Sequence, residues 1–127
     1  MDAQALLTRI QTANVMAADC PSRVVLQHLT SRWGTLVMIA LATGTHRFSA
    51  LRRQVSGVSE RMLAQTLQQL EVDGFVLRVA HDVVPPHVDY SLTPMGRQAS
   101  AHIIALSAWI EANLPAILSQ AQVKSAA

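Results

Sequence analysis

Cysteine is nearly absent from this chain, and charged residues are scarce. The single cysteine among the 127 residues, Cys20, excludes a disulfide within the chain and a metal site built on several thiolates. Only 14% of the residues are charged while half are apolar, which is a low charged share for a solitary soluble domain. We therefore expect the chain to bury further apolar surface in an oligomer.

Segments that would direct the chain into or across a membrane are also lacking. The first twenty residues are amphipathic, are interrupted by Asp2, Arg9 and Asp19, and show neither the basic nor the apolar region of a signal peptide. The longest uncharged stretch, residues 33–46, is too short and too polar to span a bilayer. We expect a cytoplasmic protein with no membrane partner.

Patterns that carry catalytic chemistry are missing as well. The sequence shows no Ser-His-Asp spacing, carboxylate pair, phosphate-binding loop or metal-binding cluster. Its five histidines have no spacing typical of metal ligands. The sequence therefore argues against an enzyme, and we assign it no cofactor and no metal.

Arginine is the basic residue that the chain does use. Nine of its ten basic residues are Arg, and four of these fall within residues 47–61 against a single acid, Glu60. The net charge of +2 is too small to indicate a nucleic-acid partner by itself. Arg, however, is the side chain best suited to bidentate contacts with phosphate or guanine, so its local concentration favours such a partner.

Residues 47–92 are predicted to form two short helices followed at once by a hairpin. The predicted elements are a brief strand at 47–48, a helix at 50–55 capped by Ser49, a turn at 56–58, a helix at 60–72 capped by Ser59, and strands at 75–81 and 88–92. Gly74 ends the second helix, and Pro85 and Pro86, which cannot donate ladder bonds, lie in the hairpin tip. This order predicts a winged helix-turn-helix, which places its second helix in the DNA major groove.

Further helices are predicted on both sides of this region. They cover residues 3–17, 22–29, 33–42 and about 94–118, followed by a polar tail that frays. The last helix has a broad apolar stripe over 103–114, but Arg97, His102 and Glu111 favour a dimer interface over a membrane span. We predict one mainly helical domain, 1–127, with a small β-hairpin wing.

The second helix of the pair has two chemically different sides. Leu63, Leu67 and Leu70 recur at helical spacing and define its buried side. At about 100° per residue, the opposite side carries Arg61, Gln65, Gln68 and Val72, flanked by Met62 and Gln69. Arg can read guanine and Gln can read adenine through paired hydrogen bonds, so this side is suited to base edges.

Candidate DNA contacts are assigned by element. The residues predicted to reach base edges are Ser59, Arg61, Met62, Gln65 and Gln69, of which Arg61 is the strongest candidate. Ser49, Arg52 and Arg53 on the preceding helix are expected to touch phosphates, with one of the two arginines facing a carboxylate instead. For Arg78 and His81 on the wing, two roles stay open: contact with DNA, and a position on the surface without a function.

Cys20 lies at the predicted start of a helix, with Pro21 suited to the first helical position. Backbone N–H groups and the helix dipole favour a thiolate there, although Asp19 opposes this effect. Two interpretations stay open: a redox or electrophile sensor, and a small apolar residue in the core. A sensor would need a disulfide across a dimer, a mixed disulfide with a small thiol, or an adduct.

Several motifs occur together in one order. They are Cys20-Pro21, then Trp33, then RFSALRR, then SERML with LE.DG, and finally VPPHVDYSLTPMG. Over about residues 20–112 this combination resembles the HxlR-type, MarR-like winged helix-turn-helix transcription regulators. The resemblance implies a homodimer held by the first and last helices, a pseudo-palindromic operator and, in some members, a redox role for the residue matching Cys20. His81 and His87 occupy wing positions where that family commonly has Arg or Lys.

The residues and the resemblance together predict a homodimeric transcription regulator that binds double-stranded DNA. Its predicted parts are a dimerisation helix at 1–18, the helix-turn-helix and wing at 47–92, and a second dimerisation helix at 94–121. The signal is expected to be an oxidant, an electrophile or a small-molecule effector, which the sequence does not identify. The alternative is a winged-helix protein–protein interaction module without specific DNA binding.

Overall fold

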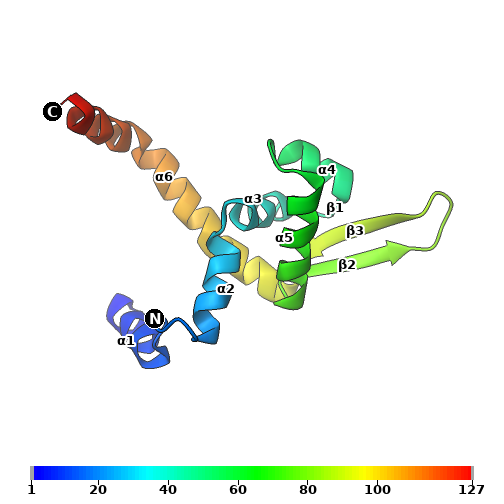
Figure 1. The fold of residues 1–127 in the computed structure, drawn as a ribbon, viewed down its shortest axis with the longest axis horizontal. Helices are drawn as coiled ribbons and strands as arrows, with labels where there is room; N and C mark the ends of the chain where they lie inside the picture. The colour runs from blue at the N-terminus through cyan, green and yellow to red at the C-terminus, as the bar shows by residue number, and fades with distance from the viewer. Residues whose placement is uncertain (1, 127) are drawn as a thin grey trace.

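A small antiparallel sheet projects from a group of helices in the computed structural model, which describes residues 2–126 (Figure 1). The elements are α1 (Ala3–Ala13), α2 (Pro21–Thr30), α3 (Arg32–Leu41), β1 (His46–Arg47), α4 (Phe48–Gln54), α5 (Glu60–Val72), β2 (Val76–His81), β3 (His87–Leu92) and α6 (Pro94–Ala126). The strands pair antiparallel in the order β1-β3-β2. The predicted fold class, mainly helical with a hairpin wing after a helix-turn-helix, is confirmed.

The core lies where α3, α4 and α5 meet the base of the hairpin. Met38 of α3 and Leu51 of α4 are completely buried there. Leu63, Leu67 and Leu70, the predicted inner side of α5, are buried with them. Burying a side chain of this size contributes about 1.5–3 kcal/mol, so these residues fix α5 and leave its other side free for function.

The first turns of α6 are fixed against this core. Ser100 is buried, and its Oγ donates a hydrogen bond to the carbonyl oxygen of Met38 at 3.1 Å. A Cβ at Gly96 would overlap the carbonyl oxygen of Phe75, so glycine is what lets α6 approach the chain just before β2. The helix therefore leaves the core in a defined direction.

Of the two predicted serine caps, the structure has one. Ser59 precedes α5, and its Oγ accepts a hydrogen bond from the backbone N–H of Met62 at 3.1 Å. The cap predicted at Ser49 is wrong, because α4 already begins at Phe48 with Arg47 as its N-cap. The helix starts early since β1 pairs with β3 only as far as Arg47, and Phe48 then packs against the core.

Both terminal helices differ in length from the prediction. α1 ends at Ala13, earlier than predicted, because Asn14 adopts a left-handed backbone conformation with a φ of 55°. α6 continues through Pro115 to Ala126, so the tail expected to fray is helical as well. The segment after Pro115 consists largely of good helix formers and contains no glycine, so its composition gives no stop signal.

α1 and the outer part of α6 lie at the end of the molecule away from the hairpin (Figure 1). Large apolar side chains on both helices are exposed, among them Leu6, Leu7 and Ile10 on α1, and Leu106 and Trp109 on α6. Among residues 2–126, α6 is also the one helix that could cross a membrane by length and composition. One such helix is weak evidence for a membrane span, and its most apolar window is not buried within the chain.

Candidate nucleic-acid interface

The outward side of α5 is polar and unobstructed. Arg61, Gln65 and Gln68 are exposed, as their helical spacing predicts. Met62 is 39% exposed at the edge of this side, and Gln69 is half-buried. Within the described part of the chain Arg61 forms no ion pair, so its guanidinium is available to a ligand.

The residues assigned to phosphate contact lie together around one hollow beside α4. Its lining residues are Phe48, Ser49, Arg52, Arg53 and Glu60. Arg52 Nη1 donates to Glu60 Oε1 at 2.9 Å, so Arg52 is the arginine that faces a carboxylate, as was expected of one of the two. Arg53 has no ion pair among residues 2–126, which makes it the less compensated cation.

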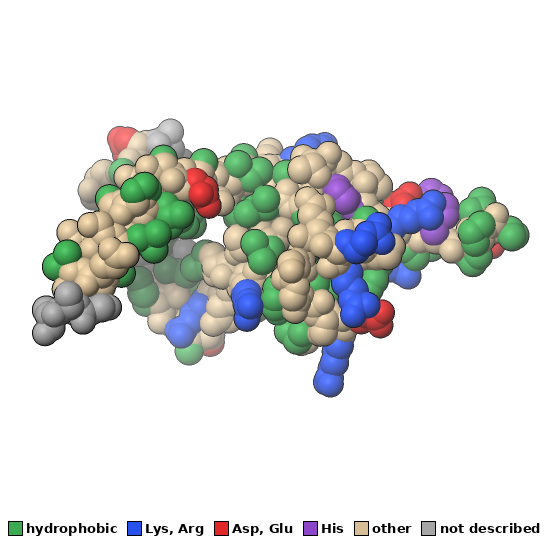
Figure 2. Space-filling view, turned by 90° about the horizontal axis from the view of Figure 1, so that it is seen from above, with side chains coloured by type: hydrophobic (Ala, Val, Ile, Leu, Met, Phe, Trp, Pro, Cys, Tyr) green, Lys and Arg blue, Asp and Glu red, His purple; other side chains and the backbone are tan. Residues whose placement is uncertain are grey.

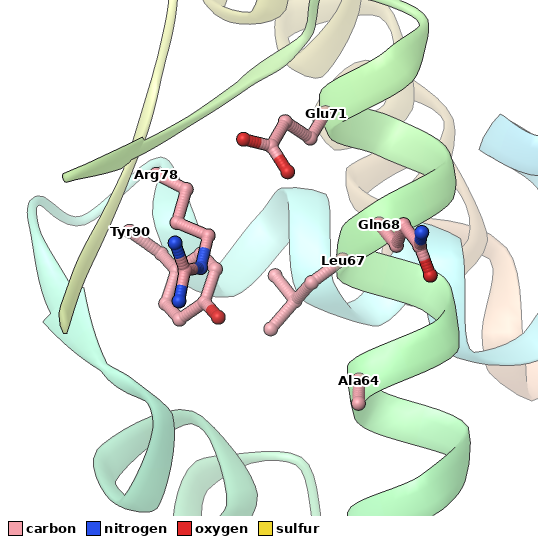
Figure 3. A pocket seen from close by; sticks show the side chains of 6 residues that line it. All are labelled: Ala64, Leu67, Gln68, Glu71, Arg78 and Tyr90. Atoms are coloured by element: carbon pink, nitrogen blue, oxygen red, sulfur yellow. The ribbon is translucent and has the colours of Figure 1, made fainter. Parts of the chain in front are cut away.

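A second hollow separates α5 from the hairpin. It is lined by Ala64, Leu67, Gln68, Glu71, Arg78 and Tyr90. Figure 3 shows Arg78 and Tyr90 extending from the hairpin toward the side of α5 that carries Leu67. Arg78 and Tyr90 are directly opposite each other in the β2–β3 register. Arg78 was assigned to the site from the sequence, but Tyr90 was missed. Aligning the two predicted strands across the hairpin tip would have placed Tyr90 opposite Arg78.

Arg78 and His81 face opposite sides of the hairpin, because successive side chains alternate along a strand. Arg78 shares its side with Tyr90, whereas His81 lies opposite His87 on the other side. His81 Nε2 is 2.8 Å from Asp89 Oδ2, and the two histidine rings stack with centroids 4.6 Å apart. Strand pairing therefore brings together two histidines and an aspartate that sequence spacing separates.

Positive charge collects where α4, α5 and the hairpin meet. Figure 2 shows most of the visible Lys and Arg side chains toward the half of the molecule that carries the hairpin, whose tip is covered by hydrophobic side chains. The four arginines of residues 47–61 lie on β1, α4 and α5. Such a surface is suited to a phosphate backbone, which dominates the affinity of proteins for nucleic acids.

Cys20 is half-buried at the N-cap of α2, and Pro21 occupies the first helical position as predicted. Farther along α2, His28 Nδ1 lies 2.6 Å from Oδ2 of Asp73, the C-cap of α5. The two side chains are only 23% and 13% exposed. α2, whose N-cap is Cys20, is thereby joined to the C-terminal end of α5 through two residues 45 positions apart in the sequence.

Comparison with known proteins gives one consistent result. A family model described as HxlR-like helix-turn-helix matches residues 28–117. The HTH-type transcriptional regulator YtfH of Escherichia coli is 57% identical over 119 residues, which cover 94% of each protein. The solved structure of ytfH from Salmonella typhimurium has a TM-score of 0.82 and 61% identity, covering 87% of this chain and 98% of its own. The redox regulator HypR in its oxidized form has a TM-score of 0.68 and 34% identity, covering 74% and 97% of the two chains.

Proposed function

The chain belongs to the HxlR-like helix-turn-helix family, and from this premise we propose how it binds DNA and what it responds to. Its general function agrees with the prediction from sequence: it is a DNA-binding transcriptional regulator. In the proposal, two copies form a homodimer in the cytoplasm. Each copy lays α5 into a major groove of one half of a pseudo-palindromic operator.

The observation that carries this proposal is the exposed Arg and Gln side of α5. Arg61, near the start of that helix, contacts a base edge, and the other base-facing residues are Ser59, Met62, Gln65 and Gln69. Ser49 and Arg53 on α4 contact phosphates, which fix the register of the protein on the duplex, while Arg52 neutralises Glu60 beside them. The hairpin with Arg78 lies near the adjacent minor groove, and the two half-sites are about 34–36 Å apart.

The apolar surfaces of α1 and α6 support dimerisation through both terminal helices. Trp109 is 57% exposed and Leu118 53% exposed on α6, while Leu6, Leu7 and Ile10 are each nearly half exposed on α1. Exposed apolar side chains grouped along a helix mark contact sites for other proteins. A second copy of the same chain, with the same helices, can cover it across a two-fold axis.

The signal in this proposal is oxidation or alkylation of Cys20. With one cysteine in each chain, the product is a disulfide across the dimer, a mixed disulfide with a small thiol, or an adduct. A shift of α2 then reaches the DNA-binding helix through the His28–Asp73 pair, which joins α2 to the end of α5. A solved neighbour at 34% identity is described as a redox regulator in its oxidized form, which supports this choice of signal.

Fluorescence anisotropy tests the proposal directly. The reduced protein is titrated against its own upstream intergenic DNA and against a scrambled control, before and after mild oxidation with diamide. We expect selective binding to the upstream DNA that oxidation abolishes and added thiol restores, and a Cys20→Ser variant that no longer responds. Selective binding that oxidation leaves unchanged would remove Cys20 from the mechanism. Weak, equal binding to both DNAs at low and high salt would favour the protein-interaction alternative.

A further inference from the structure

Three side chains able to bind a metal meet on one side of the hairpin. The nitrogen and oxygen atoms that His81, His87 and Asp89 could offer to an ion all lie within 4.8 Å of one another. His81 Nε2 is 2.8 Å and His87 Nε2 is 3.9 Å from the same atom, Asp89 Oδ2. The three side chains are 39%, 23% and 29% exposed, so all are partly shielded from water.

The register of the hairpin brings these residues together. His81 and His87 are directly opposite each other at the end of the β2–β3 ladder. Asp89 lies two residues farther along β3, and residues two apart on a strand share one side of the ribbon. Because the group draws on both strands, an ion bound there would tie β2 to β3 beside the tip.

We propose that His81, His87 and Asp89 form a binding site for a divalent transition-metal ion of the zinc class. Imidazole nitrogen suits zinc, nickel and copper, whereas magnesium and calcium prefer sites built of oxygen. Two imidazoles and a carboxylate supply three protein ligands and leave a position for water or another ligand. Ligands about 2.1 Å from a tetrahedral ion lie about 3.4 Å apart, between the two distances measured to Asp89 Oδ2.

The position of His87 distinguishes this site from a simple hydrogen bond. A bond from His81 to Asp89 could hold the hairpin without a second imidazole. His87 nevertheless stacks on His81 and turns its Nε2 toward the same carboxylate oxygen. Two ring nitrogens that converge on one oxygen are arranged as ligands around a common point, which small side-chain shifts would open to an ion.

The consequence for DNA binding rests on the proposed function. The hairpin, residues 76–92, contains one arginine, Arg78, and two aspartates, Asp82 and Asp89, so with neutral histidines its net charge is negative. A negative wing is repelled by the phosphate backbone, and a doubly charged ion reverses the sign of that charge. We therefore expect the bound metal to strengthen the contact of the wing with DNA.

Isothermal titration calorimetry of the whole chain with zinc chloride tests the metal site in the absence of DNA. We expect His87→Ala and Asp89→Asn to weaken zinc binding at least about 100-fold, because loss of a residue that only supports a ligand already costs about 10–100-fold. His102→Ala, which removes an exposed histidine of α6, is the matched control and should bind zinc as the wild type does. Cobalt(II) should give the intense visible absorption of a tetrahedral site in the wild type, and His87→Ala should abolish it.

Several outcomes would overturn the metal site. It is refuted if the wild type does not bind zinc in the micromolar range, or if His102→Ala or Cys20→Ser weakens binding as much as His87→Ala. Circular dichroism checks that each variant is folded. Asp89→Asn keeps a side-chain oxygen that can accept a hydrogen bond from His81, so it remains informative if His87→Ala does not fold.

A DNA titration then separates the site from its consequence. Zinc should strengthen the binding of the wild type to the upstream intergenic DNA. It should not change the DNA affinity of His87→Ala. Zinc binding that leaves DNA affinity unchanged would overturn the consequence and leave the site standing. Failure to bind DNA selectively, with or without zinc, would count against the proposed function and not against the metal site.

Discussion

The two ends of the molecule expose surfaces of opposite chemistry. At one end, α4, α5 and the hairpin present Arg and Gln around a core that they form together with α3. At the other end, α1 and the outer part of α6 present Leu, Ile and Trp, and none of the side chains described in α1 is buried. The first end therefore has its own core and a polar surface, whereas the second end exposes the apolar surface on which the proposed dimer rests.

Exposure alone does not separate these two surfaces, but the grouping of the exposed residues does. Val84 at the hairpin tip is 99% exposed, yet it belongs to a short turn rather than to a helical stripe. Leu106, Trp109 and Ile110 are exposed in succession along α6. Single apolar residues on a surface are ordinary, whereas contiguous patches mark contacts with other proteins.

The largest effect should come from opening the core of the end that carries α4, α5 and the hairpin. We expect Leu67→Ala to lower the free energy of unfolding by about 2–5 kcal/mol, because it leaves a cavity in the core beneath α5. Urea denaturation followed by circular dichroism measures this loss. Val72→Ala, on the exposed side of the same helix, is the control and should change stability by less than about 0.5 kcal/mol. Equal losses of stability from the two changes would mean that Leu67 is no more tightly packed in the core than the exposed Val72.

The next largest effect should fall on the other end. We expect Trp109→Glu to weaken dimerisation by at least about 2 kcal/mol, roughly 30-fold, because it places a charge in the proposed apolar interface in place of a large aromatic ring. Sedimentation velocity over a range of concentrations measures the change. Val84→Glu introduces the same charge at the hairpin tip and should leave the oligomeric state unchanged. If both variants have the oligomeric state of the wild type, Trp109 does not lie in a dimer interface.

The end that carries α4, α5 and the hairpin was the more predictable of the two, because its signals are local in the sequence. The Ser59 cap, the Leu spacing of α5 and the stop before Gly74 each depend on residues within a few positions of one another. The hollow beside Tyr90 and the histidine pair on the hairpin were missed, since both require the register of two strands. Register is a property of the pairing, which spacing along one strand does not contain.

The terminal helices were harder to predict, because propensity sets their lengths only weakly. The left-handed Asn14 ended α1 where no glycine or proline marks a stop, and Pro115 did not interrupt α6. The His28–Asp73 pair was not foreseen either, since it joins elements 45 residues apart and depends on the packing of α2 against α5. Tertiary contacts of this kind override local preference.

A smaller effect, on the sequence specificity of DNA binding, is expected from a substitution on the exposed side of α5. We expect Arg61→Ala to cost about 1–3 kcal/mol of binding to the operator and to relax base preference at one position in each half-site. Anisotropy titrations against operators with single base-pair changes measure both quantities. Arg9→Ala removes an exposed arginine of α1 and should leave binding unchanged. Equal losses on operator and random DNA would instead make Arg61 a phosphate contact.

The smallest expected effect concerns the two neighbouring arginines of α4. Arg53→Ala should weaken binding on all sequences and reduce the salt slope, the dependence of log affinity on log salt concentration, by about 0.9 for each phosphate contact that is lost. Arg52→Ala should also weaken binding on all sequences, but with a smaller change in slope, because Arg52 already neutralises Glu60. Titrations at several salt concentrations separate the two variants.

Substitution of Glu60 provides a second test of the difference between Arg52 and Arg53. If Arg52 acts mainly by neutralising that carboxylate, then adding Glu60→Gln to the Arg52→Ala variant removes the uncompensated negative charge near the phosphates. Affinity should then return toward that of the wild type, while Glu60→Gln added to Arg53→Ala should not restore the lost phosphate contact. Equal salt slopes for the two single variants, with no rescue by Glu60→Gln, would show that both arginines contact phosphate directly and that the ion pair opens on DNA.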